Sequence, residues 1–204
     1  EVGLPPVWQG AFADNFDVNT ATSWLTNRSS TDTRVTFNYN YALDGISSAP
    51  NSTGGTTRGV KFEANMANGV AAAINISPAG QNFVGDYRLR FDMWINQNGP
   101  FPAGGLGSTE HVTAGVDTTG NQLHWTGGGA SGHWFVVDGE GGSGDTTTTS
   151  VPDFGAASGT TIYAATSGVY GAGTASNSRG NGTPYYPAQF PGAAAPALQQ
   201  ANFP

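Results

Sequence analysis

The sequence predicts an all-β protein, built as an antiparallel β-sandwich. Three observations favour this fold. Several short segments alternate apolar and polar residues, clusters of Gly, Pro, Asn and Ser separate them, and no segment carries the period of an amphipathic helix. Short strands divided by turns are typical of two packed antiparallel sheets. The 204 residues suffice for one such domain with a core of its own.

The longest alternating segment covers residues 83–95 and predicts a long strand. Its odd positions from residue 87 are apolar: Tyr87, Leu89, Phe91, Met93 and Ile95. Its even positions are mostly charged: Asp86, Arg88, Arg90, Asp92 and Trp94. Because successive side chains of a strand point to opposite faces, we expect one face to contact the core and the other to face water.

Shorter segments predict the other strands. In chain order they are residues 34–41, 59–64, 70–76, 110–117, 122–126, 133–138 and 160–165. A Gly-rich connection over residues 126–132 predicts that the two strands beside it form a hairpin. In that hairpin the core side would hold Leu123, Trp125, Phe135 and Val137, and the wet face would hold Gln122, His124, Trp134 and Asp138.

The last part of the chain differs in composition. Residues 166–204 are rich in Pro, Ala, Gly and aromatic residues, which predicts a long irregular segment. We therefore expect a β-sandwich domain over residues 1–165, and a tail over residues 166–204 that packs on the domain or on a neighbouring chain. Proline lowers the entropy lost on ordering, so four rings near prolines are expected to be buried in a groove. They are Tyr185, Tyr186, Phe190 and Phe203.

Composition and charge exclude several classes of partner. The net charge is −7 and Lys61 is the only lysine, so the chain is unsuited to binding nucleic acid. No apolar stretch approaches the roughly 20 residues that a membrane helix requires. Cysteine is absent, which excludes disulfides and thiolate chemistry. The lack of cysteine and a first residue, Glu1, other than Met predict a secreted or cell-surface protein.

The two wet faces predict a glycan-binding site. An exposed indole stacks on the C–H face of a sugar ring while neighbouring polar groups bind the hydroxyls. The candidate ligand-binding residues are Arg88, Arg90, Asp92, Trp94, His124 and Trp134. In the alternative interpretation, the two tryptophans are packing residues under loops and the histidine is incidental.

An acidic Gly-rich loop is a candidate metal site. Asp138, Glu140 and Asp145 offer oxygen ligands on a flexible loop, which suits calcium. The alternative is a solvated turn. The three histidines, His111, His124 and His133, lack the close spacing of a zinc site.

No catalytic constellation is apparent. Glycosidases need two carboxyl groups about 5–10 Å apart. Asp86 and Asp92 are too widely spaced along a strand, and Asp138 and Glu140 stand where the strand ends in glycines. The chain also lacks a Gly-X-Ser-X-Gly elbow, a phosphate-binding loop and a dinucleotide fingerprint. The sequence therefore gives no ground for assigning an enzyme.

The strand pattern, the run Tyr-Arg-Leu-Arg-Phe-Asp-Met-Trp and the Gly-rich loops resemble the concanavalin A-like lectin/glucanase jelly roll. Within that superfamily the chain is most similar to laminin-G-like domains of exported bacterial proteins, over roughly residues 12–165. The resemblance implies two antiparallel sheets, one of them concave, and glycan binding, sometimes with calcium. The Glu-X-Asp-X-X-Glu signature of the laminarinase-like glucanases is absent, which argues against hydrolysis.

These observations predict an extracellular, non-catalytic glycan-binding or adhesion domain. One alternative is a structural subunit of an extracellular layer, sheath or fibre, in which the C-terminal tail joins copies into a homo-oligomer. A complete jelly roll needs further strands after residue 165, which the tail or a partner would supply unless the chain was cut. A second alternative is a glycan-active hydrolase or lyase.

Overall fold

The computed structural model describes residues 10–52, 55–67, 71–95, 111–124, 131–138, 154–163 and 167–170. These residues form short strands and 3-10 turns, and every strand pairing among them is antiparallel. The strands are β1 (Trp24–Arg28), β2 (Thr33–Asn40), β3 (Arg58–Ala64), β4 (Ile74–Pro78), β5 (His111–Val116), β6 (His133–Asp138), β7 (Phe154–Ser158) and β8 (Thr161–Ile162). The 3-10 turns are η1 (Ala21–Ser23), η2 (Tyr41–Asp44) and η3 (Gly168–Tyr170). The all-β class is confirmed, and none of the described helices is long and apolar enough to cross a bilayer.

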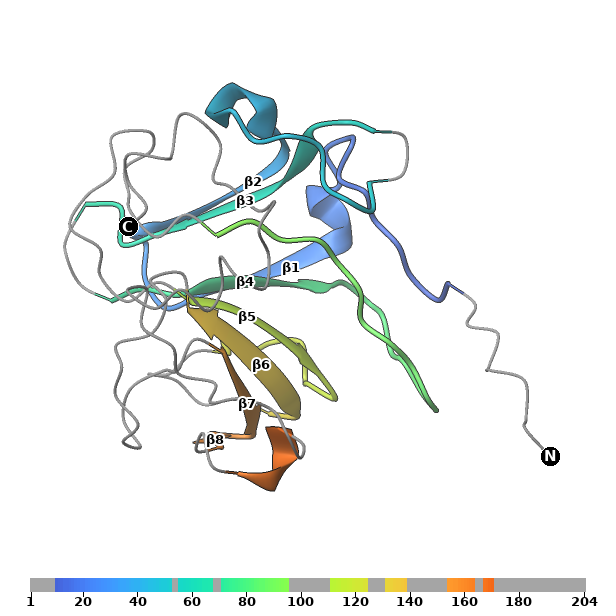
Figure 1. Ribbon diagram of the computed structural model, residues 1–204, viewed down its shortest axis with the longest axis vertical. Helices are drawn as coiled ribbons and strands as arrows, with labels where there is room; N and C mark the ends of the chain where they lie inside the picture. The colour runs from blue at the N-terminus through green and yellow to red at the C-terminus, as the bar shows by residue number, and fades with distance from the viewer. Residues whose placement is uncertain are drawn as a thin grey trace, which may run out of the picture.

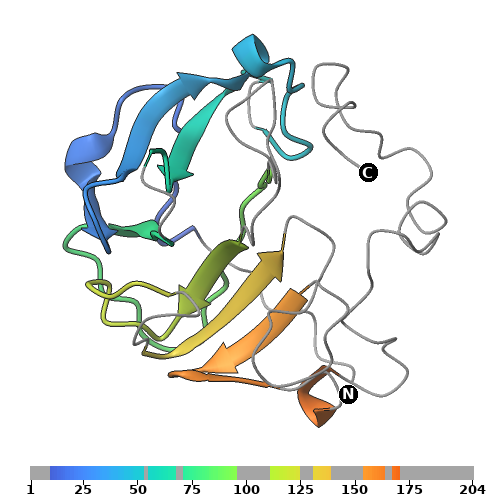
Figure 2. The ribbon, with the colours of Figure 1, turned by 90° about the vertical axis from the view of Figure 1, so that its left-hand side faces the viewer.

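The strands form three sheets. Two are strand pairs, β1–β4 and β2–β3, and the third has the order β5–β6–β7–β8. Figure 1 shows them one below the other, from β2 and β3 at the top to β8 at the bottom. Seen from the side in Figure 2, they follow one another as a curved wall. The jelly-roll arrangement stays a prediction.

The β2–β3 pair is the longest and contains an irregularity. Its register places Arg34 opposite Glu63 and Thr36 opposite Lys61, and it shifts between Thr36 and Tyr39. Asn38 lies in that shift with a φ of 59°, a left-handed conformation that asparagine tolerates better than most residues. Its side-chain amide donates to the carbonyl oxygens of Phe16 and Asp17. The irregularity therefore fixes the N-terminal segment against β2.

Two asparagines connect the β1–β4 pair to the four-stranded sheet. Asn27 of β1 and Asn75 of β4 are directly opposite each other. The Asn27 amide donates to the carbonyl oxygen of Gly120 at 3.1 Å, and the Asn75 amide donates to that of Gln122 at 2.9 Å. Both acceptors lie in the chain that leaves β5, so this amide pair ties one sheet to the next.

The small buried core lies in the four-stranded sheet. Trp134 and Val136 of β6 are 4% and 0% exposed, and Ala157 of β7 packs with them. The Trp134 indole N–H donates to the carbonyl oxygen of Gly159 at 2.8 Å, which satisfies its one donor. Gly115 of β5 lies opposite Trp134, where a Cβ would stand 3.1 Å from the Trp134 Cβ. The missing side chain of this glycine makes room for the tryptophan.

Three predictions about individual strands are wrong. Residues 83–95 form no ladder among the described residues, and Leu89, Phe91 and Met93 are about half exposed rather than packed on a core. Residues 122–124 are not a strand either, because β6 pairs with β5 and β7 instead. The faces of β6 are also reversed: Trp134 and Val136 point to the core. The four tail aromatics, from Tyr185 to Phe203, lie outside the described residues.

Candidate functional site

The candidate binding surface is the extended segment of residues 87–95, which we call the ribbon. It begins at a firm anchor. The Tyr87 hydroxyl donates to Asp117 Oδ1 at 2.7 Å and accepts from the Asp117 backbone N–H at 2.7 Å. The hydrogen bond to the Asp117 carboxylate, together with burial, raises the pKa of Tyr87. Tyr87 therefore stays neutral and fixes the start of the ribbon beside the end of β5.

Two further contacts hold the middle of the ribbon. The Asp92 carboxylate accepts from the backbone N–H of Asn51 at 2.9 Å and from its side-chain amide at 2.8 Å. The Phe91 ring stacks on Phe135 of β6, with centroids 5.9 Å apart and planes inclined by 13°. The ribbon thus has no ladder partner among the described strands, and side chains hold it in place instead.

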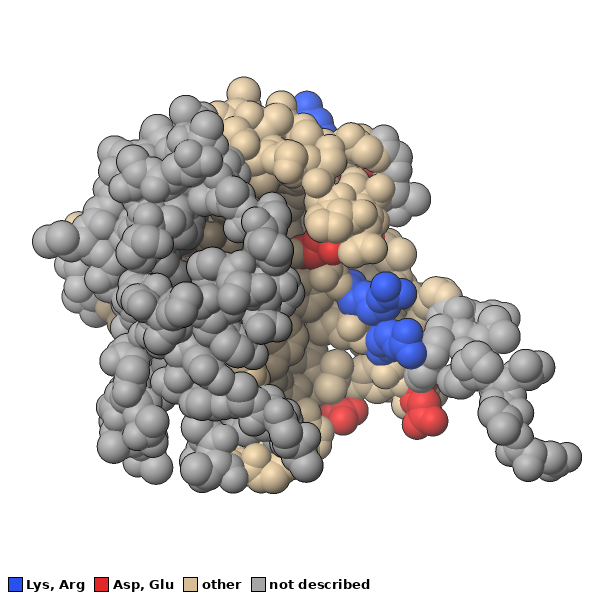
Figure 3. Space-filling model, in the orientation of Figure 1, with Lys and Arg blue, Asp and Glu red and all other residues tan. Residues whose placement is uncertain are grey.

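Beside these anchors the ribbon presents two cations and an indole to solvent. Arg88 and Arg90 are exposed, and Trp94 is 43% exposed. Figure 3 shows positive charge gathered over this segment, and these arginines are its two cationic residues. Arg90 makes no ion pair with any other described residue. The guanidinium and the indole face are therefore available to a polar ligand.

The other two predicted ligand residues are not part of this surface. His124 and Trp134 are 8% and 4% exposed, and their rings meet edge to face at a centroid distance of 6.0 Å. A His124 ring nitrogen, Nε2, lies 3.1 Å from the carbonyl oxygen of Ser131. The prediction that both residues lie on a wet face is wrong, because the side of β6 that carries Trp134 is the core side.

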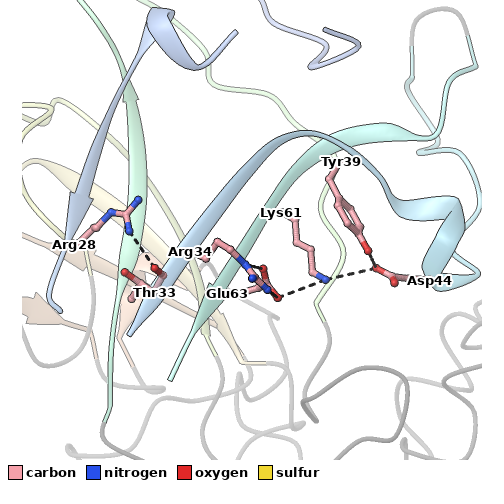
Figure 4. A network of polar contacts seen from close by, with 7 residues as sticks. All are labelled: Arg28, Thr33, Arg34, Tyr39, Asp44, Lys61 and Glu63. Carbon is pink, nitrogen blue, oxygen red and sulfur yellow. Dashed lines mark hydrogen bonds and ion pairs between the residues drawn. The ribbon is translucent and has the colours of Figure 1, made fainter. Parts of the chain in front are cut away.

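A charge network on β2 and β3 was missed by the reading of the sequence. Arg34 binds Glu63 with two hydrogen bonds of 2.6 and 2.7 Å. Lys61 lies 3.6 Å from Glu63 and 3.9 Å from Asp44, and Tyr39 donates to Asp44 at 2.9 Å (Figure 4). Figure 4 also shows Arg28 donating to the Thr33 carbonyl at 3.0 Å. The signal available in the sequence was the alternation of Lys61 and Glu63 in one strand.

The pKa directions indicate that this network is structural. The hydrogen bond from Arg34 lowers the pKa of Glu63 against the effect of burial. Burial and the hydrogen bond to Asp44 raise the pKa of Tyr39. Glu63 therefore stays ionised and Tyr39 stays protonated near neutral pH, so neither is poised for proton transfer.

A shallow cleft near the start of the described chain is also held by structural contacts. It is lined by Phe12, Ala13, Asp14, Asn15, Thr20 and Ser23. Asp14 accepts hydrogen bonds from Thr20 Oγ1 at 2.5 Å, Trp24 Nε1 at 2.8 Å and the Phe16 N–H at 2.8 Å. Burial opposes ionisation here, but these three bonds prevail and lower the pKa of Asp14. The carboxylate holds the neighbouring chain in place.

The calcium prediction falls largely outside the described residues. Asp138 ends β6, and Glu140 and Asp145 are not described. In the parts of the chain that the structure covers, no group of three or more His, Asp or Glu side chains could hold a metal ion. His111 is partly buried, and this desolvation lowers the pKa of its ring and favours the neutral form. The acidic-loop calcium site stays a prediction.

Comparison with family models, with curated proteins and with solved structures found no match for this chain.

Proposed function

We propose that this protein is an extracellular, non-catalytic glycan-binding or adhesion module that binds its ligand along the ribbon. The observation that carries the proposal is the exposed Trp94 indole on the same extended segment as Arg88 and Arg90. An indole face binds the apolar face of a sugar, and guanidinium groups donate directed hydrogen bonds to hydroxyl or carboxylate oxygens. Both kinds of contact lie within a few residues of each other.

The anchors of the ribbon support binding because they preorganise it. Tyr87 is held by Asp117 and Asp92 by Asn51, so little backbone freedom is left to lose when a ligand binds. Asp92 contributes less directly than the sequence predicts. Its carboxylate is engaged by Asn51, and its role is to position the segment between Arg90 and Trp94.

The test is a glycan array followed by calorimetry on any hit. Trp94→Ala should weaken binding by about 1–3 kcal/mol, the effect of losing one good anchor. Phe62→Ala is the matched control, because Phe62 is an aromatic residue of β3 with a similar exposure of 42% and lies outside the ribbon. An array without a hit, or equal losses for the two variants, would contradict the proposal.

A structural subunit of an extracellular layer, sheath or fibre is the second candidate. The observation that favours it is the backbone of residues 89–95, which forms no backbone–backbone hydrogen bond within the described chain. Such a segment is a template for strand addition by another chain. Light scattering separates the candidates, because a protein that forms nothing larger than a dimer at high concentration supports the binding module. Oligomers that dissociate when residues 183–204 are deleted support assembly through the tail.

A further inference from the structure

We propose that the ribbon is also a self-association surface, on which the ribbons of two copies pair antiparallel about a twofold axis at Phe91. The pairing goes beyond glycan binding and does not depend on it. It uses the backbone edge of the ribbon, whereas the glycan would contact the side chains of one face.

The ribbon has the geometry of a strand that lacks a partner. Neither a turn nor a bend interrupts residues 87–95, and Figure 1 shows them as an extended trace. The backbone of residues 89–95 makes no backbone–backbone hydrogen bond among the described residues. Leu89 and Met93 are about half exposed. Extended backbone that has no backbone partner among the described residues, together with half-exposed apolar side chains, is prone to pair with another strand.

The apolar side chains are complementary in this register. An axis at Phe91 places Phe91 opposite its own copy, Leu89 opposite Met93, and Tyr87 opposite Ile95. Every pair on this face is therefore apolar or aromatic. Directly opposite side chains of an antiparallel pair are close enough to contact each other.

The charged side chains match in the same register. Arg90 lies opposite Asp92 of the second copy, and Arg88 lies opposite Trp94. The first pair joins opposite charges, and the second places a guanidinium beside an indole, a favourable cation–π partner. Twofold symmetry makes each contact twice. Although Asp92 also accepts two hydrogen bonds from Asn51, a carboxylate has about four acceptor sites and can bind the second arginine.

Other registers of the two ribbons are less favourable. A parallel arrangement in register would place Arg90 on Arg90 and Asp92 on Asp92. An antiparallel axis at residue 90 or residue 92 also brings two like charges together at the axis. A one-residue shift of register, which pairs odd with even positions, places the apolar side chains opposite the charged ones. Charge and apolar patterns together select the axis at Phe91.

This pairing has a consequence for ligand binding. In an antiparallel pair related by an axis normal to the sheet, paired residues project from the same face. The arginines and tryptophans of both copies would then form one continuous surface. A polysaccharide long enough to cover it would bind two chains at once, which raises the apparent affinity through effective concentration.

The absence of cysteine makes the register directly measurable. Directly opposite Cα atoms of an antiparallel pair are about 4.5–5.5 Å apart, within the range of about 4.4–6.8 Å that a disulfide spans. Leu89→Cys protein mixed with Met93→Cys protein should therefore give a cross-linked heterodimer under mild oxidation. Leu89→Cys alone is the matched control, because the two thiols would be offset by four residues, about 13 Å.

Phe91→Cys should cross-link with itself, since the residue lies on the axis. If loss of the Phe135 contact impairs folding of that variant, the mixed pair at positions 89 and 93 still reports the register. The wild-type chain should show a concentration-dependent dimer by light scattering, and Arg90→Glu should weaken that dimer at least tenfold. Equal cross-linking in the mixed pair and in Leu89→Cys alone, or a wild-type monomer at all concentrations, would overturn the proposal.

Discussion

The β2–β3 pair and the four-stranded sheet are stabilised in different ways. Arg34, Glu63, Lys61 and Asp44 connect across the β2–β3 pair through ion pairs on a partly solvated face. In the four-stranded sheet, Trp134 and Val136 are removed from water, and the indole N–H bonds a backbone carbonyl. The stability of the β2–β3 pair depends on charges and therefore on pH and salt, whereas the stability of the four-stranded sheet depends on packing.

This difference sets the expected size of mutational effects. Burial of a large side chain is worth several kcal/mol, but exposed ion pairs contribute little. Substitutions in the four-stranded sheet should therefore lower the free energy of unfolding most, while substitutions in the network should change how stability responds to pH and ionic strength.

The largest effect is expected from Trp134→Ala. Removal of this side chain leaves a cavity and the unpaired Gly159 carbonyl, and should destabilise the protein by about 3–5 kcal/mol in chemical denaturation. Trp134→Phe keeps most of the ring and loses the N–H bond, so about 1–3 kcal/mol is expected. A loss below about 1 kcal/mol for the alanine variant would show that β6 does not carry the core.

Gly115→Ala should have a smaller effect, through overpacking. The new Cβ would lie 3.1 Å from Trp134 Cβ and 3.2 Å from the carbonyl oxygen of His133. We expect a destabilisation of about 1–3 kcal/mol, measured by thermal or urea unfolding. Gly168→Ala is the control, because no described atom outside its own short turn lies within 4 Å of the added Cβ, so the stability of the protein should change by less than about 0.5 kcal/mol.

Glu63→Gln should have the smallest effect at neutral pH and a distinct effect in acid. The folded-state pKa of Glu63 lies below its ordinary value of 4.5. As pH falls, Glu63 is therefore protonated at a higher pH in the unfolded chain than in the folded chain. Its contribution to stability is present above pH 4.5 and is lost as pH falls through the folded-state pKa. Wild-type stability should therefore fall more steeply below pH 4.5 than that of the variant. Parallel profiles would argue against the Arg34–Glu63 contact.

Parts of the fold are predictable from the sequence, and particular residues show why others are not. The alternation of residues 34–41 and 59–64 predicts β2 and β3, because each strand carries its own pattern. The alternation of residues 83–95 is just as clear, yet a ladder also requires a neighbouring strand, which a local pattern does not report. In β6 the run Trp-Phe-Val-Val is apolar throughout, so its period does not reveal which face is buried.

The candidate site shows the same limit. Arg88, Arg90 and Trp94 are exposed as their even positions predict, but Leu89, Phe91 and Met93 are exposed to a similar degree, so the alternation does not distinguish two faces here. The attachment of Asp92 to Asn51 joins residues 41 positions apart, and no local pattern predicts it. Trp134 lies outside the candidate site because β6 pairs with β5 and β7. This long-range pairing differs from the hairpin that the sequence predicts.

Amide hydrogen exchange of dilute, monomeric protein tests the central claim, that the ribbon is an unpaired surface segment held by side chains. Residues 89–95 should exchange rapidly, because their amides have no backbone partner among the described residues, while Val136 in β6 should be strongly protected. Asn51→Asp would place a second carboxylate against Asp92 and should loosen the ribbon further without affecting Val136. Protection of residues 89–95 equal to that of β6 would contradict the account, because it would place the ribbon inside a sheet.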